Sequence, residues 1–466
     1  MKIQFFGAAQ TVTGSKHLLT LESGYKVLLD CGMFQGMGPE GIKRNQDFGF
    51  DAAEVDCVIL SHAHIDHSGL LPKLYAEGFN GKIYCTPATA DLCGIMLRDS
   101  AFIQVSDLKY INRRRAKKGE SLLNPLYTME DAEAVLGNLF HVNYLEPFLI
   151  NDEITFNFTD QGHLLGSAAI NISIKEKART FTLTFTGDIG RPNDQLLRGP
   201  EKFPQADYIL CESTYGDRLH EKIQGAEERL LKIVRETCVV NKGKLIIPAF
   251  SVDRTQELVF ALDKMEHAGL LPRIKVFVDS PLSVNATRIM RKHRECFNDT
   301  LLNYLKTDED PFGFDNLEYV SSVIRSKELN DIKEPCIIIS SSGMAEAGRV
   351  KHHIANTIKK KSTTILIVGY CSPGSLGSEL KTGKKEVRIF GEIYPVNAHV
   401  EVIDSYSAHA DYSEMIAYLG CQEAKKVKQM FLVHGELLTQ TSFKRRLEEV
   451  GFEAVSIPKY LEEISI

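Results

Sequence analysis

The chain has 466 residues, of which 43% are hydrophobic and 25% are charged, and its formal net charge is −6. This length accommodates two or three domains, and the composition is that of a globular protein. The negative net charge excludes a polyanion-binding surface that covers the whole molecule, so any contact with nucleic acid requires a local groove of Lys and Arg. The ten cysteines include no C-x-x-C pair, which predicts reduced, mostly buried thiols rather than a disulfide framework.

No stretch reaches the roughly 18 apolar residues that a membrane span requires, so none is expected. The first residues, "MKIQFFGAAQTVTG", lack a long apolar core and are better interpreted as a first strand than as a signal peptide. We therefore expect a cytoplasmic protein.

The first 210 residues are rich in short β-type runs separated by polar or glycine breaks. The runs are "IQFFG", "HLLTL", "KVLLDCG", "CVILSH", "KIYCTP", "ITFNFTD", "AAINISI" and "TFTLTFTGD". Helical patterns occur at about 87–105 and 128–140, and the second opens on Thr128 with Asp131 three residues later, a capping-box signal. This alternation predicts two sheets covered by helices.

From about residue 211 the pattern changes to fully apolar runs that end in small or polar residues, separated mostly by helical stretches. They are "KLIIPAF", "IKVFVDS", "CIIISSS" and "TILIVGY". Such runs are typical of buried parallel strands in an α/β unit. The β-rich style returns near residue 386, and helix-like segments flank "QMFLVHGE". The simplest organisation is one domain, 1–210 and 396–466, interrupted by an α/β insert over 211–395.

One basic run, "NRRRAKK" at 112–118, stands out from the acidic chain. The ordinary interpretation is a solvated helix end or loop. The alternative is a patch that binds a phosphate backbone.

The sequence "HAHIDH", at residues 62–67, comes after the apolar run "DCVIL". His62 and His64 are two residues apart, so an extended segment points both to one side. Asp66 and His67 follow on the next turn, offset from that pair. One ion cannot take all four ligands from so short a loop, but two neighbouring ions can. Mixed imidazole and carboxylate ligands suit zinc better than manganese or iron.

Each ion then needs ligands from elsewhere, and three residues occupy suitable strand ends. His163 lies in "TDQGHLLGSAA", Asp188 in "FTGDIGR" and His434 in "FLVHGE". A lone His after a strand is usually an ordinary loop or core residue. Three such positions together with H-x-H-x-D-H favour metal ligation.

The motifs "HAHIDHSG", "GHLLGSA" and "TGDIGR" resemble those of the metallo-β-lactamase fold. The resemblance implies an αββα sandwich with the metals at one edge. It also implies that His62, His64 and His163 bind one zinc, that Asp66, His67 and His434 bind the other, and that Asp188 bridges them. Asp30, in "VLLDCG", matches the family position whose carboxylate orients a metal ligand without binding the metal itself.

The 211–395 insert and the return are similar to the β-CASP nucleases of this superfamily. "LCESTYGDR" with Glu212, "SYSAHADYSE" with His409 and "LVHGE" with His434 resemble that family's motifs A, B and C, and "PAFSVDRTQEL", "VDSPLS" and "ISSSGMAEAGR" resemble its insert. A histidine at motif C resembles the RNA-processing branch, among bacterial and archaeal relatives of the mRNA 3′-end processing endonuclease. The fold class is therefore expected to be α/β, a metallo-β-lactamase sandwich with an inserted β-CASP domain.

Phosphodiester hydrolysis needs a nucleophile, charge neutralisation at phosphorus and a proton for the leaving oxygen. Two zinc ions, with Mn²⁺ as the alternative metal, meet the first two needs. We expect His409 to supply the proton, with Glu212 holding its imidazole oriented and protonated. The competing interpretation of His409 is an Asp-paired structural histidine at a helix start.

A phosphate grip is expected from Ser342, in the "SSSG" after a buried strand, and from Arg254 and Arg349 near similar strand ends. Ordinary helix caps and salt bridges are the alternative for each of the three.

The expected function is a zinc-dependent ribonuclease that hydrolyses single-stranded RNA by a two-metal mechanism in RNA processing or decay. A small-molecule metallo-hydrolase of thioester or lactone type is the main alternative, although it has no use for the insert. A diiron oxidoreductase would carry Glu in place of His64, and an inactive scaffold would lack ligands. Endo- or exonuclease mode and assembly into a homo-oligomer stay open.

Overall fold

The computed structural model describes residues 1–177, 179–220, 225–369, 371–372, 374–403 and 408–466. The chain divides into two compact units. Unit 1 comprises Met1–Leu219 and Ala408–Ile466, and unit 2 comprises His220–Ser407. Unit 2 is therefore an insertion in unit 1.

Strand pairing explains why these limits lie later in the chain than the expected 211 and 396. The strand β11 (Tyr208–Glu212) pairs with β10 and β20 and so belongs to unit 1. The strand β19 (His399–Ile403) pairs with β16 and so belongs to unit 2. The β-rich segment after residue 386 thus completes the insert before the chain returns to unit 1.

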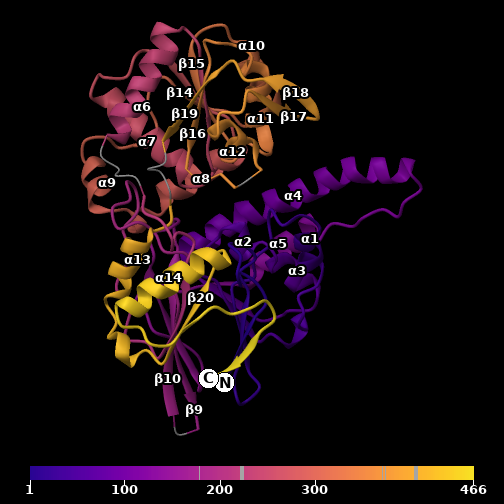
Figure 1. Ribbon diagram of the computed structural model, residues 1–466, viewed down its shortest axis with the longest axis vertical. Coiled ribbons are helices and arrows are strands. Elements are labelled where there is room, and N and C mark those ends of the chain that lie inside the picture. The colour runs from indigo at the N-terminus through magenta and orange to yellow at the C-terminus, as the bar shows by residue number, and fades with distance from the viewer. Residues whose placement is uncertain (178, 221–224, 370, 373, 404–407) are drawn as a thin grey trace. The chain divides into compact units, whose positions relative to one another are not determined.

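Within the described residues, unit 1 is built on two sheets, and each is part parallel and part antiparallel (Figure 1). The first has the order β22 (Glu463–Ser465), β1 (Lys2–Phe5), β2 (His17–Thr20), β3 (Lys26–Leu29), β4 (Cys57–Ile59), β5 (Lys82–Cys85), β6 (Leu139–His141). The second has the order β21 (Val455–Ser456), β20 (Gln429–Val433), β11, β10 (Arg179–Phe185), β9 (Ala168–Glu176), β8 (Ile154–Asp160), β7 (Phe148–Asn151).

Helices flank these sheets. Those after the first sheet's strands are α1 (Gly38–Gln46), η1 (Ala52–Glu54), α2 (Ile65–Ser68), α3 (Leu71–Ala76), α4 (Pro87–Lys117), α5 (Met129–Val135) and η2 (Leu136–Asn138). Those of the returning segment are α13 (Tyr412–Leu419), η6 (Ala424–Lys426) and α14 (Leu437–Glu449), which flank β20 as expected. Met415 and Phe443 from α13 and α14 pack on Met430 and Leu432 of the second sheet. The α/β fold class and the αββα sandwich are confirmed.

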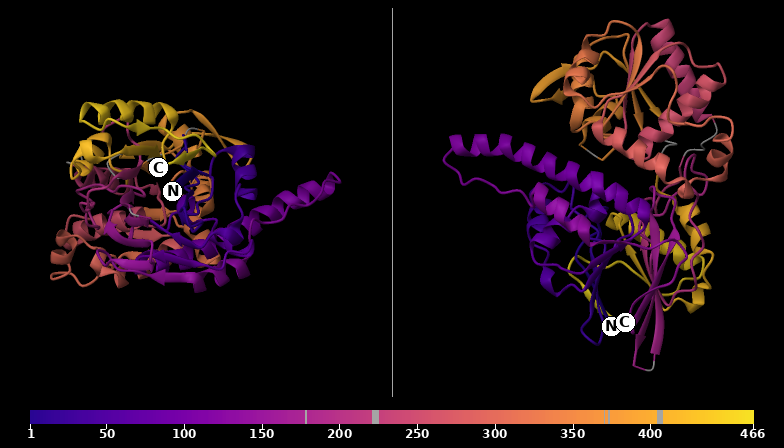
Figure 2. Two further views of the ribbon diagram at one scale, coloured as in Figure 1. Left: turned by 90° about the horizontal axis from the view of Figure 1, so that it is seen from below. Right: turned by 180° about the vertical axis from the view of Figure 1, so that it is seen from behind.

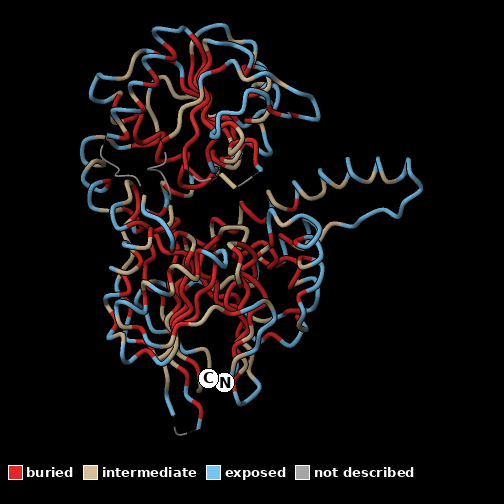
Figure 3. Tube along the Cα trace, viewed as in Figure 1, coloured by how far each residue is buried: buried red, intermediate tan, exposed pale blue. Residues whose placement is uncertain are grey.

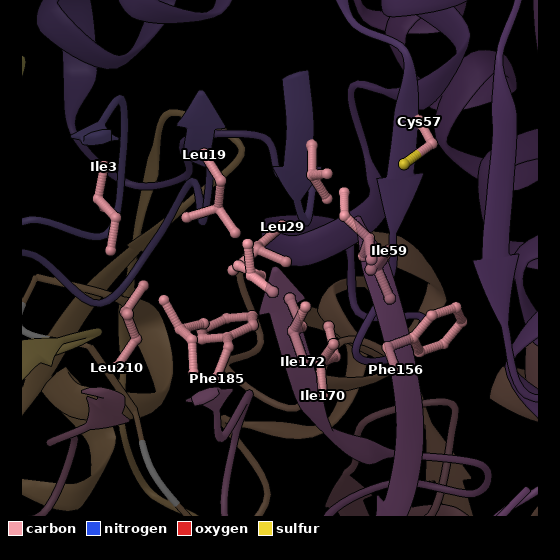
Figure 4. Packing of buried hydrophobic residues seen from close by; sticks show 14 of the residues in the cluster. Ile3, Leu19, Leu29, Cys57, Ile59, Phe156, Ile170, Ile172, Phe185 and Leu210 are labelled. Atoms are coloured by element: carbon pink, nitrogen blue, oxygen red, sulfur yellow. The ribbon is translucent and has the colours of Figure 1, made fainter. Parts of the chain in front are cut away.

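The sandwich interior is an apolar layer between the two sheets (Figure 4). Along β9, Ile170, Ile172 and Ile174 are buried while the residues between them are half-buried, which is the period-2 pattern of a strand with one face on a core. Leu29 of the first sheet and Phe185 of the second are fully buried in the same cluster. Figure 3 shows the buried trace running through both sheets.

Unit 2 is an α/β unit whose sheet is parallel at every described pairing, as the apolar runs predicted. Its order is β14 (Leu317–Tyr319), β13 (Lys275–Val278), β15 (Cys336–Ser340), β12 (Lys244–Pro248), β16 (Thr364–Val368), β19. A separate hairpin joins β17 (Glu386–Ile389) and β18 (Glu392–Pro395). The helices are α6 (Ala226–Val234), η3 (Arg235–Val240), α7 (Arg254–His267), α8 (Pro281–Lys292), η4 (Arg294–Cys296), α9 (Asp299–Tyr304), α10 (Val323–Asp331), α11 (Gly348–Thr357) and α12 (Leu376–Lys381).

Local predictions are mostly confirmed. Thr128 and Asp131 form the expected capping box at α5. The cysteines are free, and most are buried. The helix expected at 87–105 is α4, which continues to Lys117, because its polar end is rich in Arg and Lys, which favour helix. Among the described residues, no helix is long and apolar enough to cross a membrane.

The interior layer should dominate the stability of unit 1. Leu210 is 0% exposed on β11, an interior strand of the second sheet, so Leu210→Ala should lower the free energy of unfolding by about 2–5 kcal/mol through lost burial and the cavity it leaves. Lys175→Ala, at an exposed position of the same sheet, should change it by less than about 0.5 kcal/mol. Denaturant unfolding of the two variants measures the difference, and equal midpoints would contradict this account of the core.

Candidate metal centre

The predicted ligands gather at one edge of the sandwich because each follows the carboxyl end of a strand. Asp30 follows β3, His62 to His67 follow β4 and open α2, His163 lies between β8 and β9, Asp188 follows β10, Glu212 ends β11 and His434 follows β20. Strands β3 and β4 are parallel to each other, as are β10, β11 and β20, so their carboxyl ends meet at a shared edge. His409 lies just before α13. Residues 405–407 of its motif lie outside the described residues.

A first group consists of His62, His64, His163 and Asp188, whose ligand atoms lie within 4.8 Å of one another. Nδ1 of His64 is 3.1 Å from Nε2 of His62 and 3.2 Å from Nε2 of His163. Oδ2 of Asp188 is 3.6 Å from Nε2 of His62 and 3.4 Å from Nε2 of His163. Three ring nitrogens and one carboxylate oxygen therefore converge on one point.

A second group consists of Asp66, His67 and His434, within the same limit. Nε2 of His67 is 3.3 Å from Nε2 of His434, which is 3.4 Å from Oδ2 of Asp66. Oδ1 of Asp188 is 3.3 Å from Nε2 of His67. The two oxygens of Asp188 thus face different groups, as a bridging carboxylate does.

Buried hydrogen bonds set which nitrogen each ring presents. Nδ1 of His67 lies 2.6 Å from Oδ2 of Asp30 and donates to it, so Nε2 faces the group. The Ser61 hydroxyl donates to Asp30 at 2.9 Å and therefore accepts from Nδ1 of His62 at 3.1 Å. His62 then also presents Nε2. Asp30 orients two of the rings, one directly and one through Ser61.

Thr214 does the same for His434. Its hydroxyl donates to Oε2 of Glu212 at 2.6 Å, because a carboxylate only accepts. The same oxygen therefore accepts from Nδ1 of His434 at 3.0 Å. Nε2 of His434 is left to face His67 and Asp66.

Electrostatics favour neutral rings in the first group and positive charge in the second. Burial lowers the pKa of His62 and His163 well below its ordinary value and that of His64 to about 4. Burial also lowers the pKa of His67, but the charges of Asp188 and Asp30 outweigh it and hold that pKa well above the ordinary value. Neutral imidazoles are the ligand form, and the second group attracts a cation.

The residues fit a pair of divalent ions. His67 and His434 both commit Nδ1 to another acceptor, so their Nε2 atoms, 3.3 Å apart, require a positive charge between them or on one ring. Oδ1 of Asp188 and Nδ1 of His163 are buried and accept or donate no hydrogen bond among the described residues. Imidazole with a few carboxylates is the donor set of zinc. Asp188, Glu212 and His434 also lie within 4.8 Å, but Glu212 is already held by the backbone N–H of Ile189 and by Thr214.

His409 lies beside the first group, with its Nδ1 directed to Glu212. Its Nδ1 is 3.2 Å from Oε2 of Glu212, which is fully buried, and 3.9 Å from Oδ2 of Asp188. Its ring centre lies 4.5 Å from that of His163. Burial lowers the pKa of His409, but Glu212, Asp188 and Asp66 raise it to about 9 overall.

Ser61 and Thr214, which orient His62 and His434, were not among the residues that the sequence predicted, and neither was Gly32. Serine and threonine are common after strands, so neither residue type marked them. The "DCG" turn carried a better signal, since a Cβ on Gly32 would clash with the carbonyl of Asp66. Only glycine lets this turn lie against the ligand loop.

The expected phosphate ligands in unit 2 lie in other contacts. Arg349 donates to the buried carboxylate of Asp279 at 2.7 Å and to the carbonyl of Ser321 at 2.6 Å. Arg254 is buried in an ion pair with Glu257. The Ser342 hydroxyl accepts from the backbone N–H of Ala347 at 3.3 Å. The two arginine contacts fit the alternative of structural salt bridges, and the phosphate role of all three stays a prediction.

The Asp30 contacts yield a test of ligand orientation. Asp30→Asn removes the charge that fixes His67 and should weaken zinc affinity by about 10–100-fold without removing a ligand. Asp152→Asn, the same change at an exposed turn, should leave affinity unchanged. Competition with a chromophoric chelator measures both, and equal affinities would show that Asp30 does not support the centre.

Comparison with known proteins agrees with this architecture. Residues 17–214 match the metallo-β-lactamase superfamily, 255–380 the β-CASP domain, and 393–458 the Zn-dependent metallo-hydrolase RNA specificity domain. Ribonuclease TTHA0252 of Thermus thermophilus is 36% identical over 466 residues, which is 100% of both chains. An RNase J-like protein of Methanocaldococcus jannaschii is 31% identical over 98% of this chain and 97% of its own.

Transcription termination factor FttA of M. jannaschii is 28% identical over 100% of this chain and 72% of its own. The resemblance inferred from the motifs is therefore confirmed along the whole sequence. The chain belongs to the metallo-β-lactamase-fold β-CASP ribonuclease family.

Proposed function

We propose that this protein is a metal-dependent ribonuclease of RNA processing or decay that hydrolyses single-stranded RNA at the edge of unit 1. The observation that carries the proposal is the pair of ligand groups that share Asp188 next to His409. The full-length similarity to proteins named ribonuclease and RNase J-like supports RNA as the substrate. A flexible single strand also reaches buried ligands more readily than a stiff duplex does.

We assign one zinc ion to His62, His64 and His163 and a second to Asp66, His67 and His434. Asp188 would contact both, since its oxygens face different groups. When bound, two such ions supply a nucleophilic oxygen at neutral pH and offset negative charge at phosphorus. Manganese is the alternative metal for the same donors.

The leaving oxygen also needs a proton, and His409 is placed to give it. Glu212 accepts from Nδ1 of His409, which fixes the ring and favours its protonated form. Glu212 is fixed in turn by Thr214 and by the backbone N–H of Ile189. The ring then acts as a general acid, while Glu212 positions it.

The metal assignment makes a direct prediction. Purified protein should contain close to two zinc ions per chain, as measured by mass spectrometry of the metal content. Asp188→Ala should lose metal and RNA cleavage together, because it removes the ligand common to both groups and leaves imidazoles without a counter-charge. Full activity in a metal-free preparation would contradict the proposed function.

A second comparison separates the proton donor from the ligands. His409→Ala should keep both ions but cleave RNA slower by roughly 10²–10⁴. Glu212→Gln should show a milder loss, since it only orients and charges the ring. His434→Ala should lose metal from one group as well as rate.

Zinc content and single-turnover cleavage of a labelled RNA are measured for the three variants side by side. Loss of zinc in His409→Ala would make His409 a ligand, and full activity would make it structural. Hydrolysis of a thioester at a higher rate than RNA by the unmodified protein would instead favour a small-molecule hydrolase.

A further inference from the structure

The outer part of α4 extends beyond the other helices of unit 1. We call residues 102–127 the α4 arm: the helix from Phe102 to Lys117 and the segment that returns to Tyr127. It projects from the body of unit 1 in Figure 1 and, seen from behind, in the right-hand panel of Figure 2. Figure 3 shows that most of its trace is exposed. An extension this exposed adds little to the core of unit 1.

The α4 arm is an ordered structure, because hydrogen bonds join the returning segment to the helix. The side-chain amide of Asn112 donates to the carbonyl of Leu123 at 2.8 Å and accepts from its N–H at 2.9 Å. Arg115 donates to the carbonyl of Ser121 at 2.7 Å and pairs with Glu120. These contacts hold one side of the helix against the return, so the opposite side faces solvent.

That opposite side combines large apolar side chains with cations. Ile103, Tyr110 and Arg114 lie seven and four residues apart along α4, on one face of a helix. Tyr110 is 64% exposed and Phe102 65%. The guanidinium of Arg114 lies 5.8 Å from the centre of the Tyr110 ring. The face therefore offers a flat ring and a charge side by side.

The charge is concentrated. Residues 108–118 contain six cations and no carboxylate. Of these, Arg113, Arg114 and Lys117 are exposed and make no ion pair with any residue that the structure describes, whereas Arg115 serves the arm itself. On a chain of net charge −6, such a cluster is a local attraction for a polyanion.

We propose that the α4 arm binds single-stranded RNA, holding the part of the substrate that extends away from the metal centre. Cations that follow a backbone, next to exposed aromatic rings on which bases stack, are the features of single-strand binding surfaces. The inference rests on the proposed ribonuclease function and adds a second contact to it.

The base of α4 links the arm to the site. The hydroxyls of Thr86 and Thr89 donate to the carbonyl of Gly166 at 2.7 and 2.9 Å, in the loop that carries His163. The helix rises about 1.5 Å per residue, so the Phe102–Lys117 face lies roughly 20–45 Å along it from Pro87. Only an extended substrate reaches both the ligands and this face.

A second copy of the chain fits the face less well. A symmetric contact places like patches together, which would bring two clusters of cations into repulsion. RNA meets the same cations with phosphates and the same rings with bases.

The test removes three charges and compares two RNAs. The arm variant is Arg113→Gln, Arg114→Gln and Lys117→Gln. The matched control is Lys175→Gln, Lys177→Gln and Arg179→Gln, which makes the same charge change at the exposed turn between β9 and β10. That turn lies at the opposite ends of these strands from His163 and Asp188. Single-turnover cleavage is measured over a range of enzyme concentrations, with RNAs of about 30 and about 6 nucleotides.

The arm variant should require about 10-fold more enzyme for half-maximal cleavage of the long RNA at low salt. The slope of log affinity against log salt should become shallower by about 2, since each lost contact to a single strand contributes about 0.7. The maximal rate, the zinc content and cleavage of the short RNA should not change. The control should match the unmodified protein throughout.

Equal affinity of the arm variant and the unmodified protein for the long RNA overturns the proposal, and so does an equal loss in the control. A change of sedimentation coefficient with unchanged RNA affinity overturns it in favour of contact between copies. If the unmodified protein cleaves no RNA, the proposed function fails by itself. RNA affinity measured by fluorescence anisotropy then decides the arm separately.

Tyr110 gives an independent check of base stacking. Tyr110→Ala should lower the affinity for the long RNA by about 5–100-fold. Tyr110→Phe should bind this RNA like the unmodified protein, because only the ring is needed for stacking. Equal affinity of both variants overturns the stacking contact.

Discussion

Ring nitrogens held face to face at the edge of unit 1 are the constraint on which the site depends. His67 and His434 each commit Nδ1 to a buried acceptor, Asp30 and Thr214, and bring their Nε2 atoms to 3.3 Å. Two lone pairs repel at that distance unless a positive charge lies between them or on one ring. The raised pKa of His67 means that a proton on its ring can supply this charge, and a bound metal ion would supply it in the same place.

The sandwich stabilises this arrangement, because it holds the rings at the ends of the strands, where buried groups can hydrogen-bond to them. Asp30 is fully buried and accepts from the N–H of Ser61 at 2.8 Å as well as from His67. Burying a carboxylate without hydrogen-bond partners costs free energy, so both oxygens of Asp30 need donors. The same bonds that stabilise the Asp30 charge therefore stop the ligand rings from rotating, and stability and ligand orientation share one set of contacts.

Much of this could be predicted from the sequence, because the chemistry is local there. "HAHIDH" places four donors in one loop, and the strand-end positions of His163, Asp188 and His434 follow from apolar runs that precede them. The supports could not be predicted in the same way. Ser61 and Thr214 are ordinary hydroxyl residues whose role depends on which acceptor the fold brings within 3 Å.

The sequence also did not predict the first and last residues of unit 2, because these too depend on contacts distant in the chain. A strand pattern shows that a segment is extended, but not which sheet it joins. His399–Ile403 alternates well enough for either unit, and its pairing with β16 decides the matter. The end of α4 was missed because its last turns have no apolar period, and contacts with the return segment, such as Asn112 with Leu123, hold them.

Glu212 links His409, the proposed general acid, with His434, a proposed metal ligand. It accepts from His409 at 3.2 Å and from Thr214 at 2.6 Å, and Thr214 in turn orients His434. Under the proposed assignment, one buried carboxylate would set both the protonation of His409, the general acid, and the direction of His434, a metal ligand. A metal ligand must offer a lone pair and a general acid must carry a proton, so the proposed roles of His434 and His409 require opposite protonation states. The charge of Glu212 meets His409 directly and reaches His434 only through a hydroxyl, and this difference in distance allows both states to coexist.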